Sequence, residues 1–580
     1  MIHVQLERLP RYFFLLALCI LCPLQWLSVG SNSWFRQPPK PVGDGPDYEN
    51  IAFHLWQGSG FVIDSTAPAW RAPYENSIHD YAVHLESTPR TLPTTGRPPL
   101  FPMVVAAIYG LMGRNEWGFA AVRLFSASCL AVAGSLAVRL TAELLVGSFV
   151  AFRPFVAFRS AKKAQSVAFR SAKKAPPPHT RLKHACDGAA EASGNEKERE
   201  AVFAERKGMM GEEDAIFAER KATKERKVTE QLVMVATAGG AGTTLLFVTV
   251  NRTLRDYATD FLTEPLAMLL MQCFVLLAIR VCTPTHKHTS VAAADATSFS
   301  DTAWLAIKRL WGPSLLAGIT WGALILTRSM FVVWLPIIWL LFVMAVPQSY
   351  TTRIKVATLV VVVAGLVCAP WWVRNCLVLQ RWMPLGTQGP TTLLGGYSDE
   401  ALLGNGDWQA APELQLRREL AQRPKFQALE SDSAREVRVA QAASDRVRSW
   451  FWSHLHEMPL LVARRMYVHW NPYSGASLLW KLPLIVGVIG LVVIRARSAY
   501  WLLGLPLTST LVVAAFYSTG GRFLVPLYGV LLSLAGLGVA TSVLLAGWSL
   551  QNVWFLLAGR PVPSAHPLHG ECAGTTSVHD

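Results

Sequence analysis

Charged residues are scarce in this chain of 580 residues. Asp, Glu, Lys and Arg make up 16% of it, whereas hydrophobic residues make up 52%. That balance is too apolar for an ordinary soluble enzyme of this length. Several runs instead approach about 20 apolar residues, the length that crosses a bilayer as a helix. The scarcity of charge therefore excludes a soluble enzyme and predicts an all-α polytopic membrane protein.

Cysteines are also few, and their spacing does not match that of metal ligands. Six of the nine lie inside hydrophobic runs, namely Cys19, Cys22, Cys129, Cys273, Cys282 and Cys368. We expect neither a disulfide framework nor a zinc site.

Acidic residues are outnumbered by basic ones, with a net charge of 54 − 39 = +15. In a soluble protein this surplus would indicate nucleic-acid binding. In a membrane protein it is better assigned to cytoplasmic loops and anionic lipid head groups, so we expect no nucleic-acid partner.

The apolar runs predict about ten membrane spans, with both termini in the cytoplasm. Arg8 and Arg11 precede the first run, residues 12–29, which we expect to be a retained anchor because it is long and lacks a small-x-small cleavage site. Residues 100–113 make only about 21 Å of helix against about 30 Å of hydrocarbon and predict an interfacial or re-entrant helix. Further spans are expected at residues 119–145, 231–250, 264–282, 313–327, 330–346, 356–373, 479–494, 501–517 and 523–545.

These spans divide the chain into six parts. They are an anchor, catalytic outer loop and second span (1–145), a basic insertion (146–230), a transmembrane bundle (231–375), an outer helical region (376–476), the C-terminal spans (477–546) and a cytoplasmic tail (547–580). Within the insertion, residues 156–164 recur almost at once, unchanged, as residues 167–175, and residues 151–227 carry a net charge of 18 − 11 = +7. We expect a cytoplasmic, disordered or loosely helical and dispensable segment; nucleic-acid or lipid binding is the alternative.

The polar stretch after the first span contains two acidic residues at a turn. It opens with Asp44-Gly45-Pro46-Asp47-Tyr48, passes Gly58-Ser59-Gly60-Phe61 and closes with Arg97-Pro98-Pro99-Leu100-Phe101-Pro102. The Gly-Pro pair predicts a turn, with Asp47 capping a helix that begins at Tyr48 and Asp44 left free.

The order of these motifs resembles the first outer loop of polyprenyl-phosphate-sugar glycosyltransferases of the GT-C fold, a group that includes protein O-mannosyltransferases and lipid A aminoarabinose transferases. Later segments are similar to further signatures of that family: Thr263-Glu264-Pro265-Leu266, Leu326-Thr327-Arg328, Pro370-Trp371-x-x-Arg374-Asn375 and Arg522-Phe523-x-x-Pro526. The resemblance implies a GT-C-type bundle with two large periplasmic loops in a bacterial inner membrane. It also implies transfer of a sugar, with inversion, from a polyprenyl-phosphate donor to a lipid, glycan or protein hydroxyl.

The charged residues singled out along the chain all fall at its predicted outer face: Asp44, Asp47, Arg97, Arg123, Glu264, Arg328, Arg374 and Arg522. Charge at hydrocarbon depth is costly, so such residues need a partner or a function. Arginines can bind a lipid-linked phosphate and stabilise it as it leaves, while a carboxylate deprotonates the acceptor hydroxyl.

The resemblance assigns roles to these positions. Asp44, four residues before Tyr48, matches the catalytic acid of the family. Many relatives have a second acid directly after it, where this chain has Gly45. Whether Asp47 shares or takes over the role of the base therefore stays open. Arg97, Arg374 and Arg522 would bind the donor phosphate, and Tyr48, Glu264, Arg123 and Arg328 would support the site. Purely structural roles are the alternatives: an Asx-turn for Asp44, a helix cap for Asp47, a helix-dipole contact for Glu264 and interfacial anchoring for Arg374 and Arg522.

Two other functional classes stay open, together with one cofactor. A transporter or flippase for a lipid-linked intermediate also needs many spans, but we find no inverted repeat, and a scaffold for envelope assembly would tolerate loss of both acids. His79-Asp80 and His84-x-Glu86 contain residue types that bind a divalent cation. Because no further ligand pattern accompanies them, we expect a solvated loop and no bound metal.

Overall fold

The computed structural model describes residues 2–40, 43–75, 92–174, 231–282, 299–429, 431–471, 477–494 and 497–557. About 80% of it is helical, so the prediction of an all-α protein is confirmed. Seven helices are long and apolar enough to cross a membrane, which is consistent with a polytopic membrane protein. These are Arg8–Gly30, Glu116–Val146, Gln231–Val250, Glu264–Cys282, Leu310–Thr327, Tyr350–Leu379 and Arg522–Gly547.

The other three predicted spans correspond to shorter apolar helices. These are α12 (Leu335–Ala345), residues Trp480–Val492 and α21 (Ala499–Ala515). Helix α4 (Leu100–Met112) has 13 residues, or about 20 Å at 1.5 Å per residue, so the short element predicted here is a helix too short to span the bilayer unaided.

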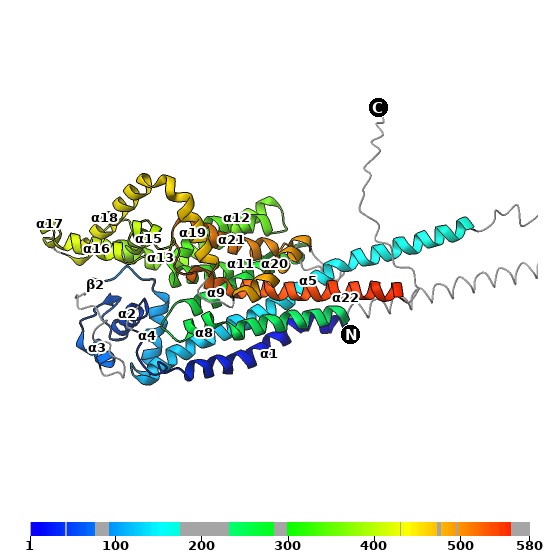
Figure 1. The fold of residues 1–580 in the computed structure, drawn as a ribbon, viewed down its shortest axis with the longest axis horizontal. Coiled ribbons are helices and arrows are strands. Elements are labelled where there is room, and N and C mark those ends of the chain that lie inside the picture. The colour runs from blue at the N-terminus through cyan, green and yellow to red at the C-terminus, as the bar shows by residue number, and fades with distance from the viewer. Residues whose placement is uncertain are drawn as a thin grey trace, which may run out of the picture.

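The long helices form one bundle whose members lie side by side (Figure 1). Its helices are α1 (Ile2–Gly30), α5 (Glu116–Lys174), the unlabelled helix Gln231–Val250, α9 (Glu264–Cys282), α11 (Phe299–Thr327), α13 (Tyr350–Leu379), α20 (Ser477–Ile494) and α22 (Tyr528–Leu557). Helix α5 continues to Lys174 without a break and extends well beyond the bundle, so the start of the basic insertion is helical. The rest of the insertion lies outside the described residues.

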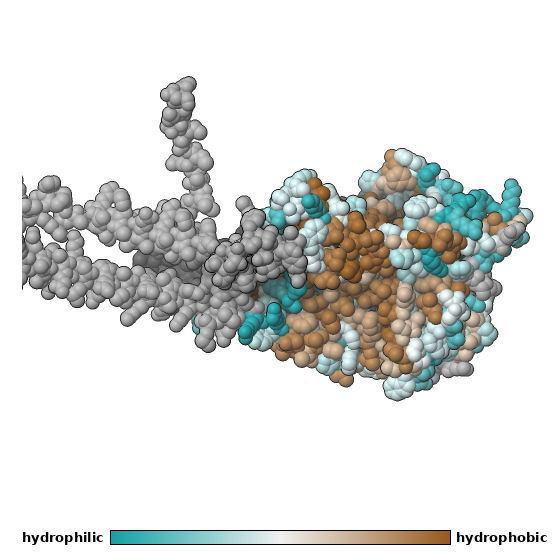
Figure 2. Space-filling view, turned by 180° about the vertical axis from the view of Figure 1, so that it is seen from behind, coloured by the Kyte–Doolittle hydropathy of each residue, from teal (hydrophilic) through white to brown (hydrophobic). Residues whose placement is uncertain are grey.

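Both polar regions lie at the same end of the bundle, opposite the N-terminus (Figure 1). The first contains α2 (Gly45–Trp56), β1 (Val62–Ile63), α3 (Pro68–Glu75), β2 (Leu92–Pro93) and α4. The second contains α14 (Gln388–Gly396), α15 (Asp399–Leu403), α16 (Ala411–Ala421), α17 (Pro424–Gln427), α18 (Asp432–Ser453), η2 (Leu455–Glu457) and α19 (Met458–Trp470). Figure 2 shows the surface of the bundle as a hydrophobic band that gives way to hydrophilic residues toward this end.

The bundle is held together by aromatic packing and by close helix contacts. Phe274 of α9 packs against Trp321, Phe342 and Trp501, with ring centroids 4.6–6.2 Å apart. Helices α20 and α22 approach so closely at Gly487 that a Cβ there would lie 1.9 Å from a backbone oxygen of α22. Small residues permit such approach, which packs membrane helices in the absence of a hydrophobic driving force between them.

Short connectors shape the polar end of the bundle. Strand β1 pairs antiparallel with β2, with Val62 opposite Pro93 and Ile63 opposite Leu92, so the chain returns to α2 just before Arg97. Helix α8 (Arg252–Ala258) leads into α9, η1 (Ser329–Val332) follows α11, and η3 (Arg522–Leu527) precedes α22. These connectors place the ends of several spans beside the first polar region.

Candidate functional site

The first helix of the polar region begins earlier than the sequence predicts. Helix α2 starts at Gly45 with Pro46 in its first turn, and Asp44 occupies the N-cap position without a side-chain capping bond. The prediction that Asp47 caps a helix beginning at Tyr48 was therefore wrong. Proline is already set for the first turn because its φ is fixed, so the turn and the helix start coincide.

The two acids share one arginine. The guanidinium of Arg97 lies 2.8 Å from an oxygen of Asp44 through Nη1, and 2.6 Å from Oδ2 of Asp47 through Nη2. Its Nε also donates to Oδ2 of Asp47, at 3.1 Å. The sequence predicted that Asp44 is free at the turn, and this was wrong. Asp44 is paired with Arg97, which lies about fifty residues later at the end of the loop.

A second arginine continues the series of ion pairs into the bundle. Nη1 of Arg522, at the start of η3, lies 2.8 Å from the other oxygen of Asp44, and its Nε donates to Glu264 at the start of α9. Glu264 is fully buried and also accepts from Arg328, at 2.7 Å. We call the six residues the ionic chain; in order of contact they are Asp47, Arg97, Asp44, Arg522, Glu264 and Arg328.

Charge sharing controls the protonation of the Asp44 carboxyl. Burial by itself raises the pKa of Asp44, but the positive charges of Arg97 and Arg522 outweigh burial and hold that pKa well below its ordinary value of 3.8. Burial likewise lowers the pKa of Arg97, and the carboxylates of Asp44 and Asp47 reverse this and raise it. Asp44 is therefore a carboxylate at any physiological pH, with both oxygens occupied.

Asp47 differs from Asp44 in having an oxygen to spare. Both of its contacts with Arg97 use Oδ2, and Oδ1 bonds to no residue in the described part of the chain. Its side chain is 31% exposed. Tyr48 is buried beneath the pair, with the guanidinium of Arg97 5.5 Å above its ring. The ring thus supports Arg97 from the helix side.

The second polar region holds the turn that carries Arg522. Oδ1 of Asp407 accepts from the backbone nitrogen of Gly520 at 2.7 Å, and the backbone nitrogen of Trp408 donates to the carbonyl of Ser518 at 2.8 Å. Gly521 follows with φ of 78°, in the left-handed region that favours glycine. Two regions far apart in sequence are thereby joined at the ionic chain.

A second contact joins the two polar regions beside Arg97. The hydroxyls of Thr95 and Thr387 lie 3.3 Å apart, and both donate to Glu436 of α18, at 3.4 and 3.1 Å. Gly386 also fits closely here, since a Cβ on it would lie 2.1 Å from the carbonyl oxygen of Thr95. The loop that carries Arg97 is therefore fixed from both sides.

Two of the predicted site arginines lie outside the ionic chain and donate hydrogen bonds to backbone carbonyls. Arg374 donates to the carbonyl oxygens of Thr94 and Phe61, at 2.9 and 3.2 Å, and stacks over Trp371. Arg123 is fully buried and donates to backbone carbonyls of residues 35–38 and of Thr259. Neither takes part in the ionic chain: Arg374 braces the first loop, and Arg123 ties residues 35–38 to the segment before α9.

Sequence reasoning missed a buried carboxylate two residues after Asp47. Glu49 accepts hydrogen bonds from Trp70, from Tyr74 and Tyr109 at 3.1 Å, and from Arg114 at 2.6 Å. The side chains of Glu49 and Arg114 are 0% and 3% exposed. This cluster joins α2, α3, α4 and the short connector between α4 and α5. Its one sequence signal is an acid near the start of α2, separated by Asn50 from the apolar residues that begin at Ile51.

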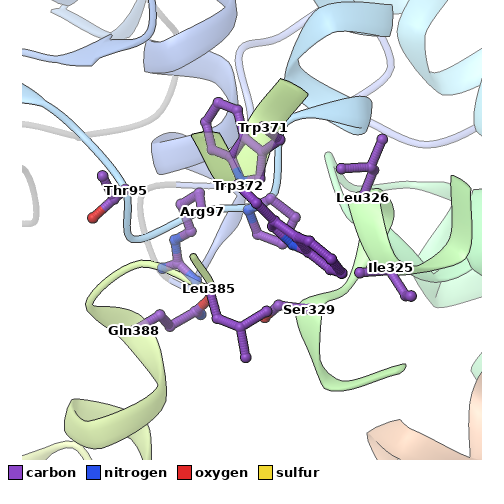
Figure 3. A pocket seen from close by; sticks show the side chains of 10 residues that line it. Thr95, Arg97, Ile325, Leu326, Ser329, Trp371, Trp372, Leu385 and Gln388 are labelled. Atoms are coloured by element: carbon purple, nitrogen blue, oxygen red, sulfur yellow. The ribbon is translucent and has the colours of Figure 1, made fainter. Parts of the chain in front are cut away.

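A pocket lies directly beside Arg97, and its empty volume, including the part open to solvent, is about 300 Å³. The close-up in Figure 3 shows side chains from four segments converging on it. It is lined by Thr95, Arg97, Pro98, Ile325, Leu326, Ser329, Trp371, Trp372, Leu385 and Gln388.

No group of three or more potential metal ligands occurs among the residues that the structure describes. The candidate ligands His79, Asp80, His84 and Glu86 fall in the undescribed stretch 76–91, so the divalent-cation alternative stays open.

Comparison with protein-family models, with curated proteins and with solved structures finds no match. The resemblance to glycosyltransferases therefore rests on the sequence motifs alone.

Proposed function

We propose that the protein is a membrane glycosyltransferase that moves a monosaccharide from a polyprenyl-phosphate donor to an acceptor hydroxyl. The observation that carries the proposal is the ionic chain. Residues from five separate segments meet at the polar end of an apolar bundle, and two of its arginines, Arg97 and Arg522, are partly exposed. Such an array suits a ligand whose anionic head lies at the membrane boundary and whose tail lies in the bilayer.

The donor phosphate would compete with Asp44 for its two arginines. Planar guanidinium groups bind phosphate oxygens through paired, charge-assisted hydrogen bonds. Arg97 keeps Asp47, and Arg522 keeps Glu264, so each arginine retains one carboxylate that orients it. Negative charge that develops on the leaving phosphate is then stabilised by groups already in place.

Release of Asp44 from the arginines supplies the base. The depressed pKa of Asp44 comes from those two positive charges, so their transfer to phosphate raises the pKa and the proton affinity of the carboxylate. The acceptor oxygen then bonds to the anomeric carbon as the bond from that carbon to the phosphate oxygen breaks. The electron pair leaves with polyprenyl phosphate, the hydroxyl proton passes to Asp44, and the anomeric centre is inverted.

The proposal includes a GT-C-type arrangement of about ten spans. The seven long helices would be joined by α12, α20 and α21, while α4 would be a short apolar helix at the interface or re-entrant in the membrane. The continuation of α5 carries Arg153, Arg159, Lys162, Lys163, Arg170, Lys173 and Lys174 without an acid, and by the positive-inside rule this supports a cytoplasmic position for that end. Both termini would then be cytoplasmic and the ionic chain would face the periplasm of a bacterial inner membrane.

A transporter or flippase is the second candidate. It would be expected to hold charge near the middle of the bilayer, at the interface of repeats. The members of the ionic chain instead lie at the start of α2, in the loop before α4, at the first residues of α9 and η3 and just after α11. This placement favours chemistry at the membrane boundary.

The proposal is tested by incubating the purified full-length protein in detergent with radiolabelled polyprenyl-phosphate monosaccharides. Wild type should consume one donor. Asp44→Asn should lower turnover about 100-fold or more, the usual contribution of a general base. The same variant should bind the donor at least as tightly as wild type, because Arg97 and Arg522 no longer face a competing carboxylate.

Two further variants complete this experiment. Asp47→Asn should retain measurable turnover, and Asp256→Asn, on the exposed surface of α8, should behave as wild type. If Asp44→Asn keeps full turnover and Asp47→Asn loses it, the general base is Asp47, acting through its unbonded Oδ1. If wild type neither binds nor consumes any donor in the presence of an acceptor-rich membrane extract, the enzyme proposal is wrong.

A further inference from the structure

The pocket beside Arg97 has an apolar wall and a polar rim. Ile325, Leu326 and Leu385 contribute aliphatic side chains, while Arg97 and Gln388 contribute polar groups. None of its ten lining residues is a carboxylate. Figure 3 shows the indole ring of Trp372 extending toward Ile325, with Ser329 nearby and Gln388 on the same side as Arg97.

Three polar groups in this pocket make no hydrogen bond within the described part of the chain. The side-chain amide of Gln388, the hydroxyl of Ser329 and the indole nitrogen of Trp372 have no hydrogen-bond partner among the described residues, and all three side chains are partly exposed. Their neighbours differ: Thr95 bonds to Glu436, and Trp371 packs edge-to-face against Phe61 with ring centroids 4.6 Å apart. The free groups are therefore available to a ligand.

We propose that this pocket binds the glycosyl group of the donor, with Trp372 as the platform for the sugar ring and Gln388 as the residue that selects among sugars. This inference rests on the proposed function. One face of a pyranose presents C–H groups that pack on an aromatic ring, and its rim presents hydroxyls. An amide both donates and accepts hydrogen bonds, so it can distinguish hydroxyl orientations.

The position of the pocket agrees with this assignment. Arg97 belongs both to the pocket and to the ionic chain, so a sugar in the pocket would have its phosphate beside the arginines. The polyprenyl tail would leave along the apolar surface of the bundle.

The experiment compares two ligands of the full-length protein in detergent: the sugar-bearing donor that wild type consumes, and the same polyprenyl phosphate without sugar. Trp372→Ala should weaken binding of the donor about tenfold or more and leave binding of the sugar-free lipid unchanged, whereas Trp372→Phe should retain most of the affinity. Gln388→Leu should change the ratio of kcat/KM between donors that differ in one hydroxyl. This second variant tests the pocket independently if Trp372→Ala fails to fold.

Matched controls are available outside the pocket. Trp382→Ala removes an indole that is 87% exposed, and Gln422→Leu removes an exposed amide at the end of α16, so both should leave binding and selectivity unchanged. If Trp372→Ala weakens the binding of both ligands equally, the pocket holds the lipid and the inference is wrong. The inference is also wrong if donor affinity in Trp372→Ala and donor selectivity in Gln388→Leu are both unchanged. Failure of wild type to bind any sugar donor would instead refute the proposed function.

Discussion

Replacement of Glu264 by Gln should destabilise the protein far more than the same change at a surface ion pair. Glu264 is 0% exposed and accepts from Arg522 and Arg328 through the same oxygen. Gln keeps the shape but removes the negative charge, leaving Arg328 with no carboxylate and Arg522 with Asp44 alone. Removal of one partner from a buried ion pair costs about 3–5 kcal/mol, because the remaining charge stays desolvated.

Glu413→Gln is the matched control. Glu413 pairs with Arg417 at 2.8 Å, close to the 2.7 Å between Glu264 and Arg328, but its side chain is 23% exposed and lies on a surface helix. Solvent screening limits such a pair to about 1 kcal/mol or less. The free energy of unfolding, measured by tryptophan fluorescence in mixed micelles of a mild detergent and SDS, should therefore fall by several kcal/mol in the first variant alone. A difference below about 1 kcal/mol between the two variants would refute the argument that Glu264 is the buried counter-ion of the site.

Two further predictions concern residues outside the ionic chain. Arg374→Met should lower the free energy of unfolding by about 1–3 kcal/mol, because the carbonyls of Thr94 and Phe61 lose their donors, while donor affinity stays unchanged. A tenfold loss of donor affinity would instead return Arg374 to the phosphate site. Burial lowers the pKa of His469 from 6.5 to about 4, so the unfolded chain takes up a proton first as the pH falls. The contribution of His469 to the free energy of unfolding should therefore be complete above pH 6.5 and decrease toward pH 4, by about 2 kcal/mol at pH 5. His469→Gln should remove this part of the dependence of stability on pH. If the dependence is unchanged in that variant, His469 is not buried as the neutral form.

The bundle was largely predictable because its signal is local. A run of about 20 apolar residues must form a helix in lipid, where each backbone polar group needs an internal partner. Residues 264–282 and 356–373 were placed correctly for this reason, as was the short helix from Leu100. Helix lengths such as that of α12 were harder to judge, because a proline and a 3-10 turn interrupt the apolar run.

Side-chain partnerships were not predictable, since they join segments hundreds of residues apart. Asp44 was expected to be free because local turn chemistry says nothing about Arg97 or Arg522. Arg374 was expected at a phosphate site, but its tertiary neighbours are backbone carbonyls that need donors. Glu49 was overlooked because its aromatic partners lie on two other helices and Arg114 lies in the connector that follows them.

By itself, the sequence determined that this protein is an all-α chain of apolar helices, and that the acids and arginines considered for the site lie in loops or near the ends of those helices. Both features follow from the cost of placing charge and unpaired backbone groups in hydrocarbon, which acts on every short segment independently. Only the tertiary structure decided which charges meet. It brought Asp44 between Arg97 and Arg522, buried Glu264 behind them and formed a pocket beside Arg97, because helix packing and the contacts between the two polar regions determine which segment ends lie within hydrogen-bonding distance.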